Sequence, residues 1–597
     1  MANDFMDKIR ISSPLNLAAL AAISAIVLLV YWPAAYNGFV WDDLAYLFDS
    51  RFTNFSLWME SLRKPFIETY KATPNYFRPL PLLSFLLQIH GGKPDPYALH
   101  LANLILHALN TFMVGILALE VTRSFNGQRK AIWIAFAATL LYGLHPSHIE
   151  IVAWISGRFD LMVTLFLLLA LLADTFIRNH WLRCTSVGLF FFAAASSKEM
   201  AVMFPLALVA WHLARHPRPL LPIRSLIESF VRRGEMHVYL AIVVAGLAYL
   251  YWRYATMGYV YAPITTTDPN SLLAHVLLTA KSLGYYLLAT LYPFSLTSPV
   301  HPLPPVQYFE DVMAWVGLAG VTTVIGLLIW LVRKAPQHGW AWIAYVLCYL
   351  PVIHLFQMTT SGNYVHDRYM YFPLTFFALA LTLSLSIFFS QPRPRLATVR
   401  PALMAGMLFF TVWSVASIRV TTPLWSSDAT LWAWAVAKQP DSFLAHSNLS
   451  GIYNTQGKYQ ESLNEGQKAL QLNRDSPSSW INVGNALMGL GRFEEALSYQ
   501  QTAVKIAPQW PDLVRFEATS LIRLGRYQEA ERILLAAHEK KKESRPINLG
   551  LTLLYRKTGK QKLADKYFEL ATLGETPETK RKFRAYVEND LLSAGAN

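Results

Sequence analysis

Cysteine and charged residues are both scarce in this 597-residue chain. The two cysteines, Cys184 and Cys348, lie in or beside apolar segments, so no disulfide framework or thiolate metal site follows from them. Lysine, arginine, aspartate and glutamate together make up only 15% of the residues. Soluble domains usually carry about a quarter. The charge deficit lies almost wholly before residue 420, which indicates a multi-span membrane protein with a polar tail.

Long apolar runs occupy the first 420 residues. A spanning helix needs about 20 mostly apolar residues. The candidate spans are 15–36, 98–121, 131–146, 160–177, 184–197, 200–214, 236–256, 311–332, 339–357, 369–390 and 401–420. The first run is too long for a typical signal-peptide core, and we expect it to be retained as a span. A further apolar stretch, 272–292, is ambiguous from composition alone.

Basic loops set the predicted orientation. The formal net charge is +14, and the cations concentrate in short loops between apolar runs, with no nucleic-acid motif. These loops share one side if the N-terminus is cytoplasmic and 272–292 does not cross, whereas a crossing there would move Arg333 and Lys334 to the other side. We predict about eleven spans, with 272–292 re-entrant or on the outer surface. The loop at 37–97 and the tail then face outside, in the periplasm if the compact build reflects a bacterial inner-membrane protein.

The tail carries an internal repeat. Glycines at positions 457, 491, 525 and 559 recur every 34 residues, and a small residue follows each glycine five positions later. This period is typical of tetratricopeptide repeats (TPR), in which two helices joined by a turn stack on the next pair. We predict an all-α chain: a transmembrane helical bundle over 1–420, then an α-solenoid of about four repeats over 421–597. A solenoid of this kind offers a groove for a peptide, although some arrays serve only assembly.

Polar side chains gather in the loops predicted to face outside. Asp42 and Asp43 follow the first span, where two carboxylates are unfavourable next to lipid. One of them could be a catalytic base, or both could be ordinary helix-capping acids. The other candidates are Tyr76, Arg78, His145, His148, Glu150, Arg158, Asp160, Lys198, Glu199, Asp367, Arg368 and Tyr369.

Several of these residues have a structural alternative. His145, His148 and Glu150 could hold one divalent metal ion, although a loop cap or a substrate hydrogen bond is favoured because no third histidine is near. Structural ion pairs at helix ends would explain two pairs of charges, Arg158 with Asp160 and Asp367 with Arg368. Lys198 and Glu199 are harder to explain in this way, because charges within an apolar run are unfavourable unless they line a polar cavity.

The combination of charges favours one chemistry. Carboxylates at a membrane face can deprotonate a hydroxyl, and basic side chains can bind a phosphate and stabilise its leaving charge. The basic candidates are Arg78, Arg158, Lys198 and Arg368, and the remaining candidates would contact the substrates. A lipid-phosphate-linked sugar needs both functions, since its tail stays in the bilayer while the acceptor hydroxyl arrives from water.

The order of short motifs resembles the TMTC family (transmembrane and TPR repeat-containing proteins) among the GT-C glycosyltransferases. The motifs are Phe39-Val40-Trp41-Asp42-Asp43, Tyr76-Phe77-Arg78-Pro79-Leu80, His100-Leu101-Ala102-Asn103 with His107, His145-Pro146-Ser147-His148, Gly157-Arg158-Phe159-Asp160, Lys198-Glu199, Tyr285-Tyr286 with Pro293, and Asp367-Arg368-Tyr369-Met370-Tyr371-Phe372-Pro373. The resemblance implies transfer of mannose or a similar sugar from a polyprenyl phosphate to protein Ser or Thr, with an aspartate of the first loop as base. This chain departs from the animal members in having only about four repeats.

The expected mechanism is a single inverting displacement, and which aspartate acts is open. If Asp42 and Asp43 are extended, their side chains point in opposite directions and need different roles. A non-catalytic membrane scaffold whose repeats recruit envelope proteins is one alternative. An enzyme that glycosylates a lipid or a glycan is another.

Overall fold

The structure, a computed structural model, describes most of the chain. The described residues are 14–43, 77–89, 94–123, 128–216, 222–260, 272–293, 311–355, 365–390, 396–508 and 510–573, with a few single positions in 47–62 and 580–587. They are almost entirely helical, which confirms the predicted all-α class. The chain divides into two compact units, and the division in the described helical region falls between Ser427 and Asp428.

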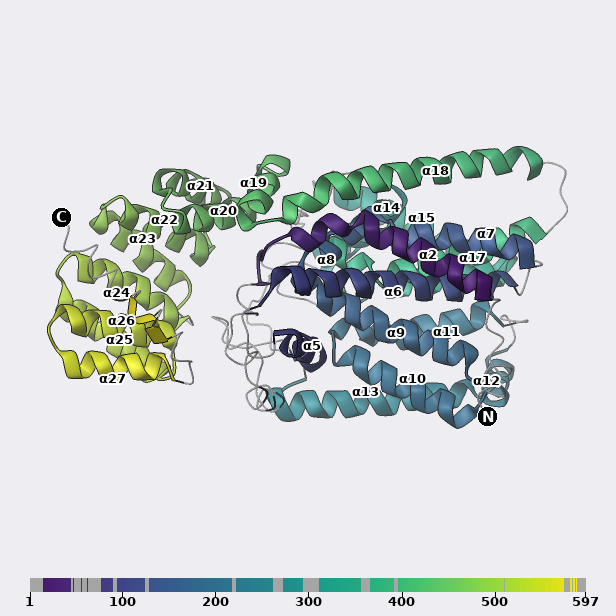
Figure 1. The fold of residues 1–597 in the computed structure, drawn as a ribbon, viewed down its shortest axis with the longest axis horizontal. Helices are drawn as coiled ribbons and strands as arrows, with labels where there is room; N and C mark the ends of the chain where they lie inside the picture. Colours follow the sequence, from purple (N-terminus) through teal and green to yellow (C-terminus); the bar gives the residue numbers. More distant parts are fainter. Residues whose placement is uncertain are drawn as a thin grey trace. The chain divides into compact units, whose positions relative to one another are not determined.

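The first unit is a bundle of long helices (Figure 1). Its helices are α2 (Pro14–Val30), α5 (Pro79–Ile89), α6 (Pro96–Arg123), α7 (Gln128–Gly143), α8 (Ile149–Ala153), α9 (Arg158–Phe176), α10 (His180–Ala195), α11 (Phe204–Ala214), α12 (Ile223–Arg232), α13 (Glu235–Met257), α14 (Leu272–Leu291), α15 (Val312–Lys334), α16 (Pro336–Leu347), α17 (Pro373–Ser390) and α18 (Leu396–Thr421). Each predicted span overlaps one of these helices. By length and composition, six helices within the described residues can cross a membrane: α6, α9 with the turn before it, α13, α14, α15 and α18.

Helix α6 joins several parts of the bundle through buried polar side chains. Asn103 donates to the carbonyl oxygens of Trp154 and Ile155, each at 3.0 Å. Asn110 donates to Leu161 O of α9, also at 3.0 Å. Buried amides are unfavourable unless they are hydrogen-bonded, so these contacts fix where the segment before α9 lies.

The predicted span at 339–357 is shorter than expected. Helix α16 ends at Leu347, and turns follow as far as His354, whose φ is +58°. Pro351 supplies the physical reason, because proline lacks an amide hydrogen and disfavours helical backbone in the residue before it.

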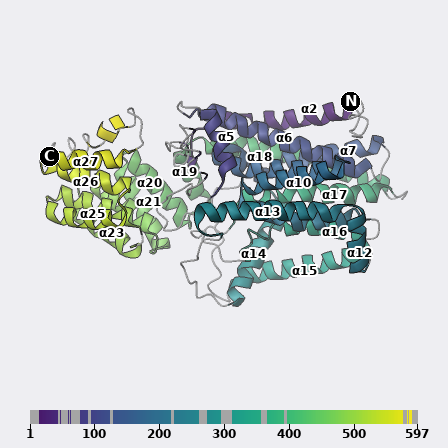
Figure 2. The ribbon, with the colours of Figure 1, turned by 90° about the horizontal axis from the view of Figure 1, so that it is seen from below.

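Helix α14 has contacts along one end of the bundle. Lys281, near its middle, is 2.6 Å from Asp311, the residue that caps the start of α15. Thr290, near its end, has its carbonyl oxygen 3.3 Å from Nε2 of His145, just after α7. Figure 2 shows α14 inclined to α15. These contacts agree with a segment that does not cross, although α14 is long and apolar enough to do so, and its path stays a prediction.

The second unit consists of paired helices. After α19 (Asp428–Lys438), the pairs are α20 (Phe443–Thr455) with α21 (Tyr459–Leu472), α22 (Pro477–Gly489) with α23 (Phe493–Ile506), α24 (Val514–Arg523) with α25 (Tyr527–Lys540), and α26 (Arg545–Lys557) with α27 (Gln561–Ala571). The repeat glycine of each pair has φ between +70° and +77°, a conformation that only glycine adopts readily. The small residue five positions later is fully buried in every pair. The predicted TPR solenoid is confirmed.

Candidate active site

The two first-loop aspartates lie in a turn. Trp41, the residue before them, has φ of +57°, which is unusual for a bulky side chain. Its ring stacks on Trp154, with ring centroids 5.1 Å apart. The chain therefore reverses direction at this point, and the extended arrangement of Asp42 and Asp43 does not occur.

Asp43 is fully buried and its carboxylate is occupied. Oδ1 accepts hydrogen bonds from the backbone N of Ser156 at 3.0 Å and from its Oγ at 2.6 Å. Oδ2 accepts from the backbone N of Val40 at 3.1 Å. Burial raises the pKa of Asp43 to about 7, although the hydrogen bonds from Ser156 and Val40 oppose the rise. Asp43 thus ties the turn to the segment before α9, whereas Asp42 remains partly exposed.

The raised pKa of Asp43 predicts a pH-dependent stability. Folding favours the protonated form of Asp43. Its contribution to the free energy of unfolding is therefore complete below the ordinary pKa of 3.8 and is lost as the pH rises through about 7. Between pH 5 and pH 8 we expect the wild type to lose roughly 2–3 kcal/mol more stability than Asp43→Asn, whose side chain does not titrate. Thermal unfolding of both proteins across this range measures the difference. Parallel curves would show that Asp43 does not titrate there.

Arg368 faces Glu150 and two tryptophans. Its Nη1 is 2.6 Å from Glu150 Oε1, and its backbone N donates to Oε2 at 3.0 Å. Its guanidinium carbon lies 5.5 Å from the ring centroids of Trp41 and Trp154. Burial lowers the pKa of Arg368, but Glu150 opposes this and the net pKa is raised, so the group stays a cation. The turn that holds Asp42 and Asp43 is therefore directly beside a fixed positive charge.

Lys198 provides a second positive charge in the same region. Its Nζ is 2.5 Å from Asp160 Oδ1, and both residues are buried. Nζ also lies 5.2 Å from the ring centroid of Tyr369, and the guanidinium carbon of Arg368 is equally far from that ring. The structure thus brings Lys198, Arg368 and Tyr369 together from segments about 170 residues apart in the sequence.

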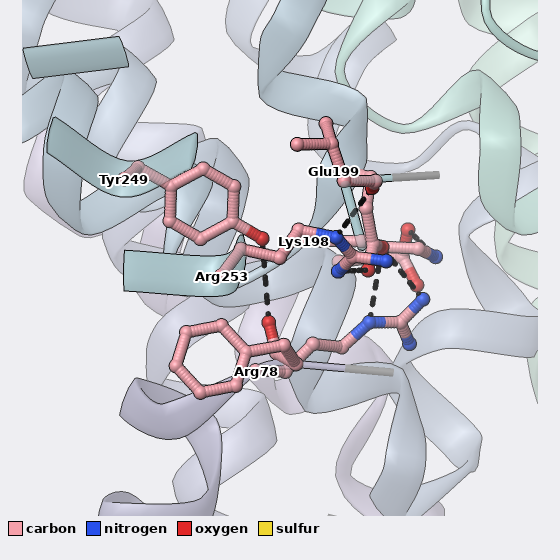
Figure 3. A network of polar contacts seen from close by, with 8 residues as sticks. Arg78, Lys198, Glu199, Tyr249 and Arg253 are labelled. Atoms are coloured by element: carbon pink, nitrogen blue, oxygen red, sulfur yellow. Dashed lines mark hydrogen bonds and ion pairs between the residues drawn. The ribbon is translucent and has the colours of Figure 1, made fainter. Parts of the chain in front are cut away.

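Glu199 lies between two arginines (Figure 3). Arg78 donates to its Oε2 through Nη2 at 2.8 Å and through Nε at 3.1 Å. Nη1 of Arg253 is 3.4 Å from Oε1, and the Tyr249 hydroxyl nearby donates to the carbonyl oxygen of Phe77. Sequence reasoning missed Arg253, although an arginine within the apolar run 236–256 was the available signal.

Arg158 is hydrogen-bonded to neighbours other than Asp160. Its guanidinium donates to Asn103 Oδ1 at 2.9 Å, to Leu99 O at 2.6 Å and to Gln88 Oε1. It also lies 4.4 Å from the ring centroid of Phe85. The structural alternative in which Arg158 pairs with Asp160 is wrong, because Asp160 pairs with Lys198. Likewise, Arg368 pairs with Glu150 and not with its neighbour Asp367, which accepts a hydrogen bond from the Tyr285 hydroxyl at 2.9 Å.

The two loop histidines have buried surroundings. His145 Nδ1 is 2.7 Å from Ser147 Oγ, and burial lowers the pKa of His145 to about 4. The His148 ring is fully buried, 4.5 Å from the ring centroid of Tyr371, and burial lowers its pKa well below the usual value. Within the described part of the chain, no three His, Cys, Asp or Glu side chains converge on a metal position. Tyr76 lies outside the described residues.

The site as a whole combines acid, base and aromatic surfaces at one end of an apolar bundle. Two described ion pairs contact Tyr369: Arg368 with Glu150, and Lys198 with Asp160. A third pair joins Arg78 to Glu199, the residue that follows Lys198 in the sequence. Charges held in a low-dielectric layer interact more strongly with an anion than they would in water. The arrangement is therefore suited to holding a phosphate beside a carboxylate that can accept a proton.

Comparison with known proteins places the chain near one group of relatives. It is 30% identical over 168 residues to the human protein O-mannosyl-transferase TMTC3, a match that covers 27% of this chain and 17% of that protein. It is 34% identical over 171 residues to the Drosophila melanogaster protein O-mannosyl-transferase Tmtc1, covering 28% of this chain and 19% of that protein. The matches thus span less than a fifth of these relatives' own length.

The tail has separate matches. A family model described as tetratricopeptide repeat matches residues 477–510. A solved structure, TTC0263, a TPR protein of Thermus thermophilus, aligns with 32% of this chain and 98% of its own at 18% identity, with a TM-score of 0.25. The chain is TMTC-like: it is similar to the TMTC protein O-mannosyl-transferases, with apolar helices able to span a membrane and a TPR tail.

Proposed function

We propose that this chain is a membrane glycosyltransferase that transfers mannose or a similar sugar from a polyprenyl phosphate to Ser or Thr of a protein acceptor. The observation that carries the proposal is the cluster of Lys198, Arg368 and Tyr369 beside the Asp42–Asp43 turn. A sugar phosphate anchored in lipid needs cations at the end of an apolar bundle, and its acceptor needs a carboxylate at the same place.

The two aspartates take different roles in this proposal. Asp42 is the catalytic base, because it is partly exposed whereas Asp43 is enclosed by Val40 and Ser156. Asp43 is a positioning residue that fixes the turn. The geometry of the turn, with Trp41 stacked on Trp154, holds the Asp42 backbone in place.

The reaction is a single displacement. The acceptor hydroxyl oxygen attacks the anomeric carbon, its proton passes to Asp42, and the bond from the anomeric carbon to the phosphate oxygen breaks. The sugar configuration inverts. The departing lipid phosphate takes the electron pair and is stabilised by Lys198 and Arg368, with Arg78 beside them. Arg158 keeps the surrounding loop in place through its hydrogen bonds to Asn103 and Leu99.

The remaining residues complete the proposed substrate site. Tyr369 offers an aromatic face to the sugar, while Glu150, Asp160 and Glu199 hold the three cations in position. The site end of the bundle faces the periplasm in this proposal, with the N-terminus cytoplasmic and the TPR tail outside. The repeats bind the acceptor polypeptide, as stacked helical repeats commonly bind extended peptides.

The test is the intact mass of envelope and secreted proteins from cells with and without this chain. A sugar-sized increment that disappears on deletion and returns with the wild-type gene is expected, and its size identifies the sugar. Asp42→Asn should fail to restore it. If no protein changes mass while a lipid or glycan does, the protein-acceptor part of the proposal is wrong. If no molecule changes mass, the enzyme assignment is wrong and a scaffold takes its place.

A further inference from the structure

A polar cavity lies at the end of the bundle opposite the candidate active site. It has a volume of about 290 Å³ and includes Asp174, Arg183, Arg215, Arg233 and Glu235 in its lining. Asp174 follows Arg158 by 16 residues on the same helix, which corresponds to about 24 Å at 1.5 Å per residue. The cavity is therefore separate from the candidate active site.

Two of the three arginines are neutralised by carboxylates. Arg183 Nη2 is 2.7 Å from Asp174 Oδ1, and the other oxygen of Asp174 is 2.8 Å from His212 Nε2. Arg233 Nη2 is 3.1 Å from Glu235 Oε1. These pairs form a polar wall from α9, α10, α11, the start of α13 and the turn before it.

Arg215, at the end of α11, is the third arginine. It is exposed, and among the described residues it has no ion-pair partner. The lining therefore carries one more arginine than carboxylates. An anion with a single charge would match this surplus.

Glu235 adds an independent sign of a ligand. The residue is only 3% exposed, and its second oxygen, Oε2, is buried without a hydrogen-bond partner in the part of the chain that the structure describes. A buried carboxylate oxygen without a donor is unfavourable. A ligand that carries a hydrogen-bond donor close to its anionic group would satisfy it.

Helix α12 shows where a bilayer surface would lie. Its exposed apolar residues Ile223, Ile227 and Val231 are spaced by four and share one face. Its buried Phe230 packs against the rings of His212 and Tyr239, directly beside the cavity. Figures 1 and 2 both show α12 at the end of the bundle where α13 begins. A short amphipathic helix of this kind lies at the level of lipid headgroups.

We propose that this cavity binds the phosphodiester headgroup of a membrane phospholipid that also carries a hydrogen-bond donor. Arg215 holds the phosphate, and the Glu235 Oε2 accepts from the ammonium of an ethanolamine headgroup or the hydroxyl of a glycerol headgroup. Basic pockets between membrane helices are known to bind phospholipid headgroups. The inference does not depend on the proposed transfer reaction, since the two sites lie at opposite ends of α9.

The experiment is native mass spectrometry of the full-length protein, titrated with short-chain phosphatidylethanolamine, phosphatidylglycerol, phosphatidylcholine or inorganic phosphate. We expect the ethanolamine and glycerol lipids to bind about tenfold more tightly than the choline lipid, which lacks a donor. Arg215→Ala should weaken both by about tenfold, and Arg215→Lys should retain most of the binding.

Arg224→Ala is the matched control, because Arg224 lies on α12 with its side chain 91% exposed and does not line the cavity. If Arg224→Ala weakened lipid binding as much as Arg215→Ala does, the effect would be due to surface charge and the proposed site would be wrong. Equal binding of the choline lipid would overturn the role of Glu235. If inorganic phosphate bound as tightly as the lipids, the ligand of the cavity would be a soluble phosphate and the lipid assignment would be wrong. Absence of binding by every probe would overturn the proposal.

Discussion

Asp42→Asn is expected to reduce sugar transfer by about 100- to 10,000-fold, the usual contribution of a positioned general base. The folded state should be unaffected, because Asp42 is partly exposed and an amide fits the same space. Asp43→Asn should lower both activity and stability. An asparagine cannot accept all three hydrogen bonds from Val40 and Ser156 through a single carbonyl oxygen. Initial rates with a polyprenyl-phosphate sugar, together with thermal unfolding, separate the two roles.

Asp95→Asn is the matched control for these variants. Asp95 lies in the same predicted loop, and its carboxylate accepts from the backbone N of Tyr97 and of Ala98 at the start of α6. Asparagine caps helices equally well, so this variant should transfer sugar at the wild-type rate. Full activity of Asp42→Asn would remove Asp42 as the base. If only Asp43→Asn loses activity while its stability is unchanged, the two aspartates exchange roles.

The identity of the candidate site residues could be predicted from the sequence, but their partners could not. Charges such as Lys198 and Glu199 stand out because they interrupt apolar runs. For Asp160 and Arg368, nearby charges in the sequence suggested ion pairs that the structure does not form. Arg368 instead pairs with Glu150, 218 residues away, and Asp160 pairs with Lys198, 38 residues away. Such contacts depend on how the helices pack, and a single sequence contains no distances between helices.

The fold was predictable where a local rule decides it. The glycines of the tail need a left-handed backbone, and all four have it. The end of α16 also follows a local rule, because Pro351 disfavours a continued helix. The apolar pattern continues past this point and therefore did not predict where α16 ends. Arg253 was missed because an arginine inside one apolar helix does not reveal that Glu199 of another segment faces it.

Lys198→Met is expected to destabilise the protein by about 3–5 kcal/mol, because it leaves the buried Asp160 carboxylate without its partner. Adding Asp160→Asn removes the stranded charge and should restore most of the stability. Sugar transfer should stay about 100-fold or more below the wild type in the double variant, since the leaving phosphate has lost a cation. Thermal unfolding and initial rates of the wild type, both single variants and the double variant form a complete cycle.

A second lysine–aspartate pair in the same unit provides the control for this cycle. Lys281 and Asp311 are 2.6 Å apart, close to the 2.5 Å of Lys198 and Asp160, but they join α14 to α15. Lys281→Met with Asp311→Asn should retain activity once stability is restored, and the asparagine keeps the cap of α15. If Lys198→Met with Asp160→Asn recovered both stability and activity, the Lys198–Asp160 pair would have a purely structural role. Because a stability defect and a lost phosphate contact respond differently to the second substitution, the cycle separates these two roles of Lys198.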